Sequence, residues 1–190
     1  MNKKEIAKDI SKNLSKYRMR HSVGVMNTSK KLAKIYGCSI ERAELAGLLH
    51  DCGKYFNDND MIKKAKELGL CISITQKYAP DLLHGPVGAE IAKSKYEDLD
   101  IDMYNSIFYH TTGRPNMSKL EKIVYVADLI EPFRNYPEVD ELRDLVGINL
   151  DLLVVKIMDR VINSLIRSNK YIDPKTVLAR NYIYHHMKKD

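Results

Sequence analysis

A chain of 190 residues with 44% hydrophobic and 29% charged side chains can bury a substantial core, and this composition excludes a disordered protein. No run approaches the roughly 18 apolar residues of a membrane helix, and no signal-peptide core follows the charged amino terminus, so we expect a cytoplasmic protein without a membrane partner. The three cysteines, Cys38, Cys52 and Cys71, fit neither a disulfide framework nor a zinc ribbon and are expected as free thiols.

The net charge of +6 is concentrated near the amino terminus, where residues 1–31 hold nine Lys or Arg and two acidic residues. A basic flank suits an anionic ligand such as a nucleotide or a nucleic acid. The alternative is a solvated helix face, which we favour for a charge run taken alone.

Apolar residues recur at helical spacing in the first third of the chain. The first stripe consists of Ile6, Ile10, Leu14 and Tyr17. A second helix, over about 20–36 and ended by Gly37, carries on one side His21, Val25, Thr28, Leu32 and Ile35. Ser39 caps a third helix, which reaches His50-Asp51 and ends near Gly53.

Further helices follow along the chain. A short surface helix is predicted over 59–68, and residues 70–84 are predicted to mix loop with short helix. Pro86 fits the first turn of a helix over 86–96, and another helix spans 101–110. Ser118 and Glu121 form a capping box before LEKIVYVADLIE, which Pro132 ends.

The last three helices are predicted over 138–146, 149–168 and 174–187. No β-alternation, internal repeat or low-complexity linker is present, so the sequence predicts an all-α, single-domain helical bundle. The apolar segment 148–168 has two interpretations, core packing and a homodimer interface, of which we favour core packing.

Single His and Asp residues interrupt these apolar stripes. In chain order they are His21, His50, Asp51, His84, His110 and Asp128. Asp128 lies in the apolar run IVYVADLI, and a buried carboxylate needs a cation or several donors. Imidazole and carboxylate without thiolate are ligands of Fe, Mn, Zn or Co, and helices of a bundle can bring such ligands together.

Each candidate also has a plainer interpretation. His21 and His110 can be hydrogen-bonded core residues, His84 a turn residue and Asp128 a salt-bridge partner. The joint pattern favours a metal site, while His185 and His186 are predicted on the surface. Lys54 and Arg134 follow the acidic candidates closely enough to neutralise phosphate oxygens, unless they are solvated cations. Motifs of zinc proteases and phosphate-binding loops are absent.

These residues match the H…HD…D signature, and the chain resembles the HD-domain metal-dependent phosphohydrolases, an all-helical superfamily. Over roughly residues 17–182 it is similar to the YqeK branch, which cleaves diadenosine tetraphosphate symmetrically to two ADP. The motifs that carry this likeness are RMRHSVGVMNTSKKLA, AGLLHDCGK, LLHGPVGAEIA, FYHTTGRPNMSKLEKIVYVADLIEPFR and the IDPKT near the carboxyl end. Cys52 departs from the branch, in which a larger, often aromatic residue is expected.

The resemblance implies an HD domain over 1–190, with a core at about 17–135 and helices 138–187 packing on it. It implies two divalent metal ions, with iron first and Mn, Co, Zn or Ni as alternatives. The implied ligands, with Asp51 as the bridge, are His21, His50, Asp51, His84, His110 and Asp128. The implied substrate contacts are Arg18, Lys54, Thr111, Arg134, Thr176 and Asn181. Catalytic roles fall to Asp51 and Lys54.

We therefore expect a hydrolase in which a metal-activated hydroxide attacks a central phosphorus of diadenosine tetraphosphate. One alternative keeps the site and changes the substrate, as in a nucleotidase or another nucleotide pyrophosphohydrolase. A second alternative is a non-catalytic regulator that binds nucleotides or RNA. The sequence contains no RRM, KH or helix-turn-helix signature, so nucleic acid is not the expected partner.

Overall fold

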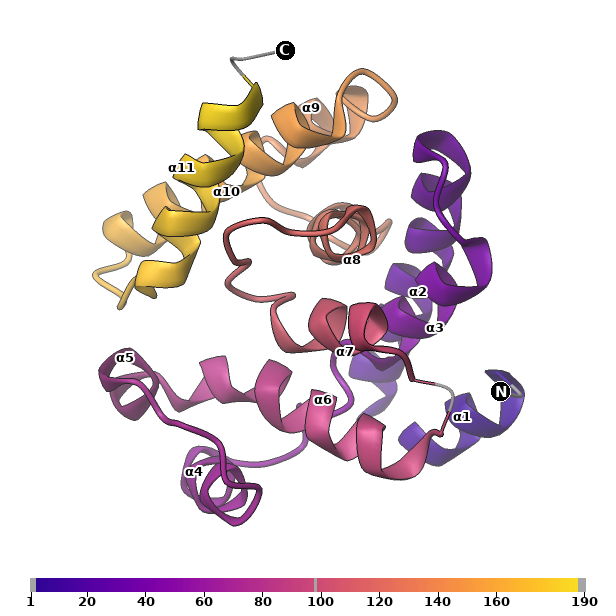
Figure 1. The fold of residues 1–190 in the computed structure, drawn as a ribbon, viewed down its shortest axis with the longest axis vertical. Helices are drawn as coiled ribbons and strands as arrows, with labels where there is room; N and C mark the ends of the chain where they lie inside the picture. The colour runs from indigo at the N-terminus through magenta and orange to yellow at the C-terminus, as the bar shows by residue number, and fades with distance from the viewer. Residues whose placement is uncertain (1–2, 98, 188–190) are drawn as a thin grey trace.

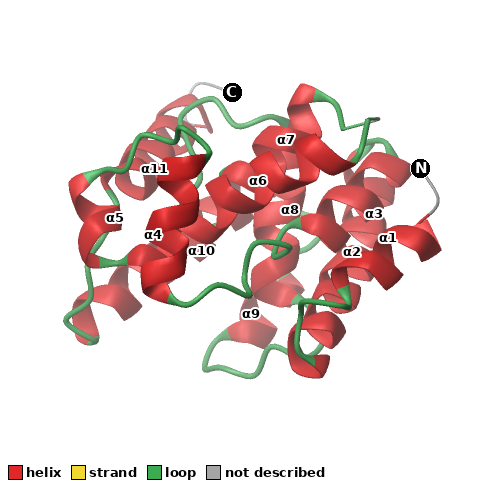
Figure 2. Cartoon of the chain, turned by 90° about the horizontal axis from the view of Figure 1, so that it is seen from below, coloured by secondary structure: helices red, strands yellow, loops and turns green. Residues whose placement is uncertain are grey.

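The computed structural model describes residues 3–97 and 99–187, and every regular element among them is a helix (Figures 1 and 2). The first six elements are α1 Lys3–Ile10, α2 Lys16–Tyr36, α3 Ile40–Leu49, α4 Asp58–Glu67, α5 Ile74–Tyr78 and the 3-10 helix η1 Pro80–Leu83. The remaining six are α6 His84–Lys95, α7 Ile101–Phe108, α8 Lys119–Ile130, α9 Val139–Asp144, α10 Leu150–Arg167 and α11 Pro174–Met187. The all-α prediction is confirmed.

Local sequence signals set most helix ends. Ser39 accepts a hydrogen bond from the backbone N–H of Arg42, and Gly37 ends α2 in the left-handed conformation with φ 66°. The predicted capping box of Ser118 and Glu121 is present at the start of α8. The predicted mixture over 70–84 is confirmed, since α5 and η1 lie there between loops.

Three assignments in the first 36 residues are wrong. The helix predicted from about residue 20 begins at Lys16, where Ser15 caps it, because α1 ends at Ile10 and the turn between them shifts the helical phase. Tyr17 consequently leaves the first stripe and is 75% exposed. Ile35, expected on the same face as Val25, is 51% exposed near the end of α2.

Helix α8 runs through the centre of the molecule, where α2, α3, α7 and α10 pack around it (Figure 1). Its residues Ile123, Val124 and Tyr125 are fully buried, in one hydrophobic cluster that extends from Ile6 to Ile183. Because α10 and α11 contribute to this cluster, we propose that they form one domain with the helices before them.

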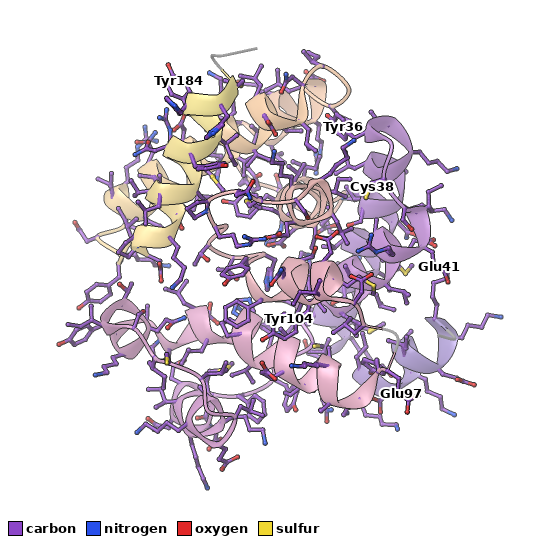
Figure 3. All side chains as sticks on the ribbon, in the orientation of Figure 1. Tyr36, Cys38, Glu41, Glu97, Tyr104 and Tyr184 are labelled. Carbon is purple, nitrogen blue, oxygen red and sulfur yellow. The ribbon has the colours of Figure 1, made fainter. Side chains whose placement is uncertain are left out.

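Polar contacts tie the carboxyl-terminal part to the rest. The backbone N–H of Gly147 donates to the Tyr36 hydroxyl at the end of α2 over 2.9 Å (Figure 3). On α9, the Arg143 guanidinium donates to the carbonyls of Ile130, Glu131 and Arg134 over 2.9–3.0 Å. Arg143 therefore holds the segment that follows α8. No helix of the described residues has the length and apolarity needed to cross a membrane, and all three cysteines are free.

The turn after α3 approaches α6 so closely that a side chain would not fit between them. A Cβ atom on Gly53 would lie 2.5 Å from the His84 carbonyl oxygen and 2.8 Å from the Gly88 nitrogen. Beside it, the Cys52 thiol donates to the Gly88 carbonyl over 3.2 Å. A small residue at position 52 is thus part of the contact that brings His84 toward the end of α3.

We predict that Gly53→Ala lowers the free energy of unfolding by about 1–3 kcal/mol, because backbone atoms of α6 must move to admit the methyl group. Urea unfolding measures the change, with the exposed Ser94→Ala on α6 as the control. Equal unfolding midpoints for Gly53→Ala and the unmodified protein would contradict the close contact.

Candidate metal centre

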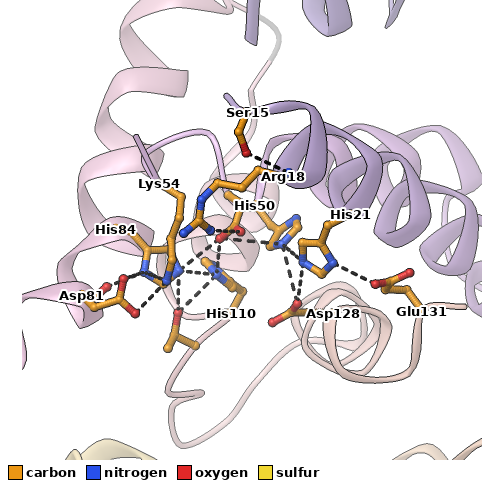
Figure 4. A network of polar contacts seen from close by, with 12 residues as sticks. Ser15, Arg18, His21, His50, Lys54, Asp81, His84, His110, Asp128 and Glu131 are labelled. Atoms are coloured by element: carbon orange, nitrogen blue, oxygen red, sulfur yellow. Dashed lines mark hydrogen bonds and ion pairs between the residues drawn. The ribbon is translucent and has the colours of Figure 1, made fainter. Parts of the chain in front are cut away.

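Six His and Asp side chains from five helices and their adjoining turns meet in one buried cluster (Figure 4). Asp51, His50, His84, His110 and His21 are each at most 8% exposed, and the Asp128 side chain is 14% exposed. These six are the residues predicted as ligands, and the structure brings all of them together.

The Nε2 atoms of the four histidines face one another in two pairs. His21 Nε2 lies 3.2 Å from His50 Nε2, and His84 Nε2 lies 2.9 Å from His110 Nε2. The Asp51 carboxylate lies between the pairs, with Oδ1 3.8 Å from His50 Nε2 and 3.2 Å from His84 Nε2. Asp128 Oδ1 lies 3.0 Å from His21 Nε2.

Three of these histidines lie directly after the last turn of a helical segment. In each, Nδ1 donates a hydrogen bond to a backbone carbonyl of that turn. His50 Nδ1 donates to Gly47 O and His110 Nδ1 donates to Ile107 O, each over 2.8 Å. His84 Nδ1 makes the equivalent short bond to Asp81 O. Carbonyls in a last turn lack intrahelical donors, so they are available to fix the imidazole tautomer.

His21 lies within α2, where the carbonyls are already engaged, and it uses a side chain instead. Its Nδ1 donates to Glu131 Oε1 over 3.0 Å, and Glu131 Oε2 accepts the Phe133 backbone N–H over 2.7 Å. A Cβ atom on Gly24 would lie 2.5 Å from Glu131 Oε2, so this glycine leaves room for the carboxylate. Glu131 was not predicted as a site residue, because an acid at the end of a helix gives no signal of a partner 110 residues away.

The donor set fits a bound cation. With Nδ1–H donated to oxygen, a neutral ring presents a lone pair at Nε2, and two such nitrogens about 3 Å apart repel unless a cation or a proton lies between them. Burial opposes protonation of His21, but Asp128 and Glu131 raise its pKa. Burial lowers the pKa of His50 to about 4 and also lowers the pKa of His84, so both rings are neutral near pH 7. Neutral imidazole is the form that binds a metal.

The carboxylates are held in the ionised form that binds a metal. Burial by itself would raise the pKa of Asp51, but His50, His110 and His84 bring it well below its usual value. Burial likewise opposes ionisation of Asp128, yet His21 and Arg134 lower its pKa strongly. Asp128 therefore lies beside histidines, as expected for a metal ligand. It also forms a salt bridge with Arg134, as expected from the plainer interpretation of Asp128 as a salt-bridge partner.

The cluster borders a cavity of about 190 Å³. Predicted substrate contacts, among them cationic side chains, line this cavity as well. Arg18 Nη1 lies 3.6 Å from Asp51 Oδ2, and Lys54 Nζ lies 2.7 Å from Asp81 Oδ2. Arg134 Nε donates to the Asp128 carbonyl over 2.7 Å, and Thr111 Oγ1 lies 3.2 Å from His84 Nε2. Arg18, Lys54, Thr111 and Arg134 therefore all surround the cluster.

The two predicted carboxyl-terminal contacts lie elsewhere. Thr176 is buried and lines a neighbouring cavity, and Asn181 is exposed on α11 beside Arg180. Residues five apart on a helix point in different directions, so a single surface does not include both. His185 and His186 are exposed, as predicted.

The fold and the buried His/Asp cluster define a helical metal-site protein, and residues 18–132 match the family model of the HD domain. The chain belongs to this family. It is 35% identical over 187 residues to a symmetrical bis(5'-nucleosyl)-tetraphosphatase of Halalkalibacterium halodurans, covering 96% of this chain and 97% of the relative. The protein of that name from Staphylococcus aureus is 38% identical over 182 residues, covering 94% and 93%.

A solved structure resembles nearly the whole chain. It is a predicted HD superfamily hydrolase involved in NAD metabolism from Clostridium acetobutylicum, with 38% identity and a TM-score of 0.93. The likeness covers 98% of each chain, including the helices after the matched HD segment.

We predict that Glu131→Gln weakens divalent-metal binding about 10- to 100-fold, because an amide accepts only one of the two hydrogen bonds that this carboxylate accepts. Competition with a fluorescent chelator measures the affinity for Mn²⁺. The control is Glu138→Gln, at a 54% exposed side chain. Unchanged affinity in Glu131→Gln would contradict the role of Glu131 in orienting His21.

Proposed function

We propose that this protein is a metal-dependent hydrolase that cleaves diadenosine tetraphosphate symmetrically to two ADP. The observation that carries the proposal is a complete buried set of six His and Asp side chains with phosphate-type cations around it. The two bacterial relatives that align over nearly the whole chain are named for this activity.

The proposed metal ligands are His21, His50, Asp51, His84, His110 and Asp128. We propose two divalent ions with Asp51 as the bridge, since this carboxylate contributes to ligand groups on both sides of the cluster. Iron is the first candidate, and Mn, Co, Zn or Ni also suit nitrogen and oxygen donors without thiolate. Bound divalent ions would supply Lewis acidity and a water of lowered pKa.

Charge balance supports the need for metals in binding a polyphosphate. The cavity is lined by three cations, Arg18, Lys54 and Arg134, and by three carboxylates, Asp51, Asp81 and Asp128, so these charges cancel. Two divalent ions would add four positive charges, which matches a tetraphosphate with roughly one negative charge per phosphate. The side chains alone give the cavity little attraction for such an anion.

The cations differ in how firmly they are held. Arg134 is fixed by hydrogen bonds to both the carbonyl and the carboxylate of Asp128, so its guanidinium has a set direction. Lys54 Nζ lies 2.7 Å from Asp81 Oδ2, on a side chain that is 68% exposed, and 3.0 Å from His84 Nδ1. The pair with the exposed Asp81 exchanges readily for a phosphate oxygen. We propose that Lys54 neutralises charge that develops on the reacting phosphoryl group.

Other features support the remaining expectations. Free thiols agree with a reducing compartment, and we propose a cytoplasmic location. The buried face of α10, with Leu153, Ile157 and Met158, packs in the core, which supports core packing over a dimer interface for that face.

We predict that His50→Ala loses metal and lowers hydrolysis of diadenosine tetraphosphate by more than about a hundredfold, because His50 is a fully buried proposed ligand whose loss leaves the cluster one donor short. Metal analysis and ADP release are measured on the same samples, with exposed His185→Ala as the control. Full activity in His50→Ala would refute the proposed metal site. Faster hydrolysis of nucleoside mono-, di- or triphosphates than of the dinucleotide would favour a nucleotidase or pyrophosphohydrolase.

We predict that Lys54→Met lowers kcat about 10²- to 10³-fold while metal content stays at the level of the unmodified protein, because the ammonium acts on phosphate oxygens and is not a ligand. Steady-state kinetics and metal analysis provide the two readouts. Lys64→Met, at an exposed Lys64–Glu67 pair on α4, is the matched control. Loss of metal in Lys54→Met would show that this lysine acts by supporting the ligands.

A further inference from the structure

Asp81 is an acidic residue in the wall of the metal cavity that the proposed metal centre does not use. Three carboxylates line this cavity, and two of them, Asp51 and Asp128, belong to the proposed ligand set. The groups of described side chains that are close enough to share an ion do not include Asp81. A third carboxylate in a cavity for a polyphosphate repels the ligand, so its presence there needs another reason.

The local structure holds Asp81 beside the proposed metal ligands (Figure 4). Pro80 begins the 3-10 helix η1, and the carbonyl of Asp81, the next residue, accepts the hydrogen bond from His84 Nδ1. The Asp81 side chain is 68% exposed, with Oδ2 2.7 Å from Lys54 Nζ and Oδ1 3.9 Å from His84 Nδ1. An exposed aspartate beside an ammonium group is ionised at neutral pH, so Asp81 places a fixed negative charge next to Lys54.

A phosphate that binds Lys54 must approach this charge. Its oxygen takes the place that Asp81 Oδ2 now occupies, or it shares the ammonium group with Asp81. In a cavity of about 190 Å³, either arrangement leaves the carboxylate beside the bound phosphate. Because the repulsion grows with the charge on the phosphate, Asp81 disfavours a doubly charged phosphate more than a singly charged one.

Internal and terminal phosphates differ in this charge. A phosphate that is bridged on both sides carries about one negative charge, as in the backbone of a nucleic acid. A terminal phosphate has a second ionisable oxygen, with a pKa of about 6, and carries roughly 1.5–2 negative charges at pH 7. The carboxylate at Asp81 can therefore distinguish the two kinds of phosphate by their charge.

Symmetrical hydrolysis of a tetraphosphate converts one kind of phosphate into the other. One water adds across the central P–O–P bond, so that its oxygen joins one phosphorus and the bridging oxygen stays on the other. Each of these two oxygens receives one hydrogen of the water. Both central phosphates thereby become terminal, and each gains a second oxygen that ionises near neutral pH.

We propose that Asp81 is a specificity-determining residue, which disfavours terminal phosphates at Lys54 and so selects an internal phosphate for attack. The inference rests on the proposed function and adds a repulsive contact to the attractive ones. The central phosphates of a dinucleoside tetraphosphate meet little of this repulsion. The terminal phosphates of nucleoside mono-, di- and triphosphates meet more of it, and so does the ADP that the reaction forms. Asp81 thus also promotes the release of product.

The test measures how ADP and its β-methyl ester bind to the manganese-loaded protein, by titration calorimetry at about pH 8, where a terminal phosphate is fully ionised. The ester keeps the nucleoside and both phosphates but lacks the second ionisable oxygen. We expect Asp81→Asn to tighten the binding of ADP about tenfold and that of the ester less than about threefold. A freed Lys54 would affect both ligands alike, so the difference between them isolates the charge effect.

Matched variants separate charge from structure. Asp81→Asn keeps the size of the side chain and the backbone carbonyl that His84 uses. Asp81→Glu keeps the charge and should discriminate between the two ligands as the unmodified protein does. Glu67→Gln removes another exposed acid, which pairs with Lys64 on α4, and should change neither affinity. Metal content is measured on every sample and should stay constant.

Equal tightening of ADP and the ester in Asp81→Asn would overturn the proposal, because loss of the carboxylate would then act only by freeing Lys54. Unchanged ADP affinity would overturn it as well, and loss of metal would assign Asp81 to the support of His84 instead. Failure of the proposed function looks different, since diadenosine tetraphosphate would then remain intact in the unmodified protein. Selective tightening of ADP in Asp81→Asn would in that case still assign this residue to the exclusion of terminal phosphates.

Discussion

The structure depends on one electrostatic constraint, the burial of four imidazole Nε2 atoms and two carboxylates within contact distance of one another. Such a set is stable only around positive charge, because lone pairs and carboxylates repel in a site that excludes water. Five helices, α2, α3, α6, α7 and α8, or the turns that follow them, each bring part of it. We therefore expect metal binding to be coupled to folding in this protein.

Helix ends explain why the histidines hold their orientation. His50, His84 and His110 each follow a helical segment by a residue or two and use a carbonyl three positions back. His21 has no free carbonyl within α2 and depends on Glu131, which the segment after α8 carries and Arg143 holds by its backbone. Residues outside the ligand set thus determine which nitrogen each histidine presents.

Two neighbouring cavities differ in their chemistry. In the metal cavity the charges of three cations and three carboxylates cancel, so bound metal ions would supply the attraction for phosphate. The neighbouring cavity is more apolar, with Leu82, Val161 and Leu165 in its lining. Asp81 and Thr111 belong to both linings, so the two cavities adjoin.

The sequence by itself determined the helical class, most helix ends and the ligand candidates, because capping residues and apolar spacing act locally and because His and Asp are conspicuous in apolar stripes. It misplaced Tyr17, since a turn after α1 changed the helical phase, and it expected Ile35 inside although this residue is exposed near the end of α2. Only the tertiary structure decided that Glu131 contacts His21, that Asn181 is exposed and that Thr176 lines a second cavity. These facts join residues up to 110 positions apart, and a local pattern contains no information about such distant contacts.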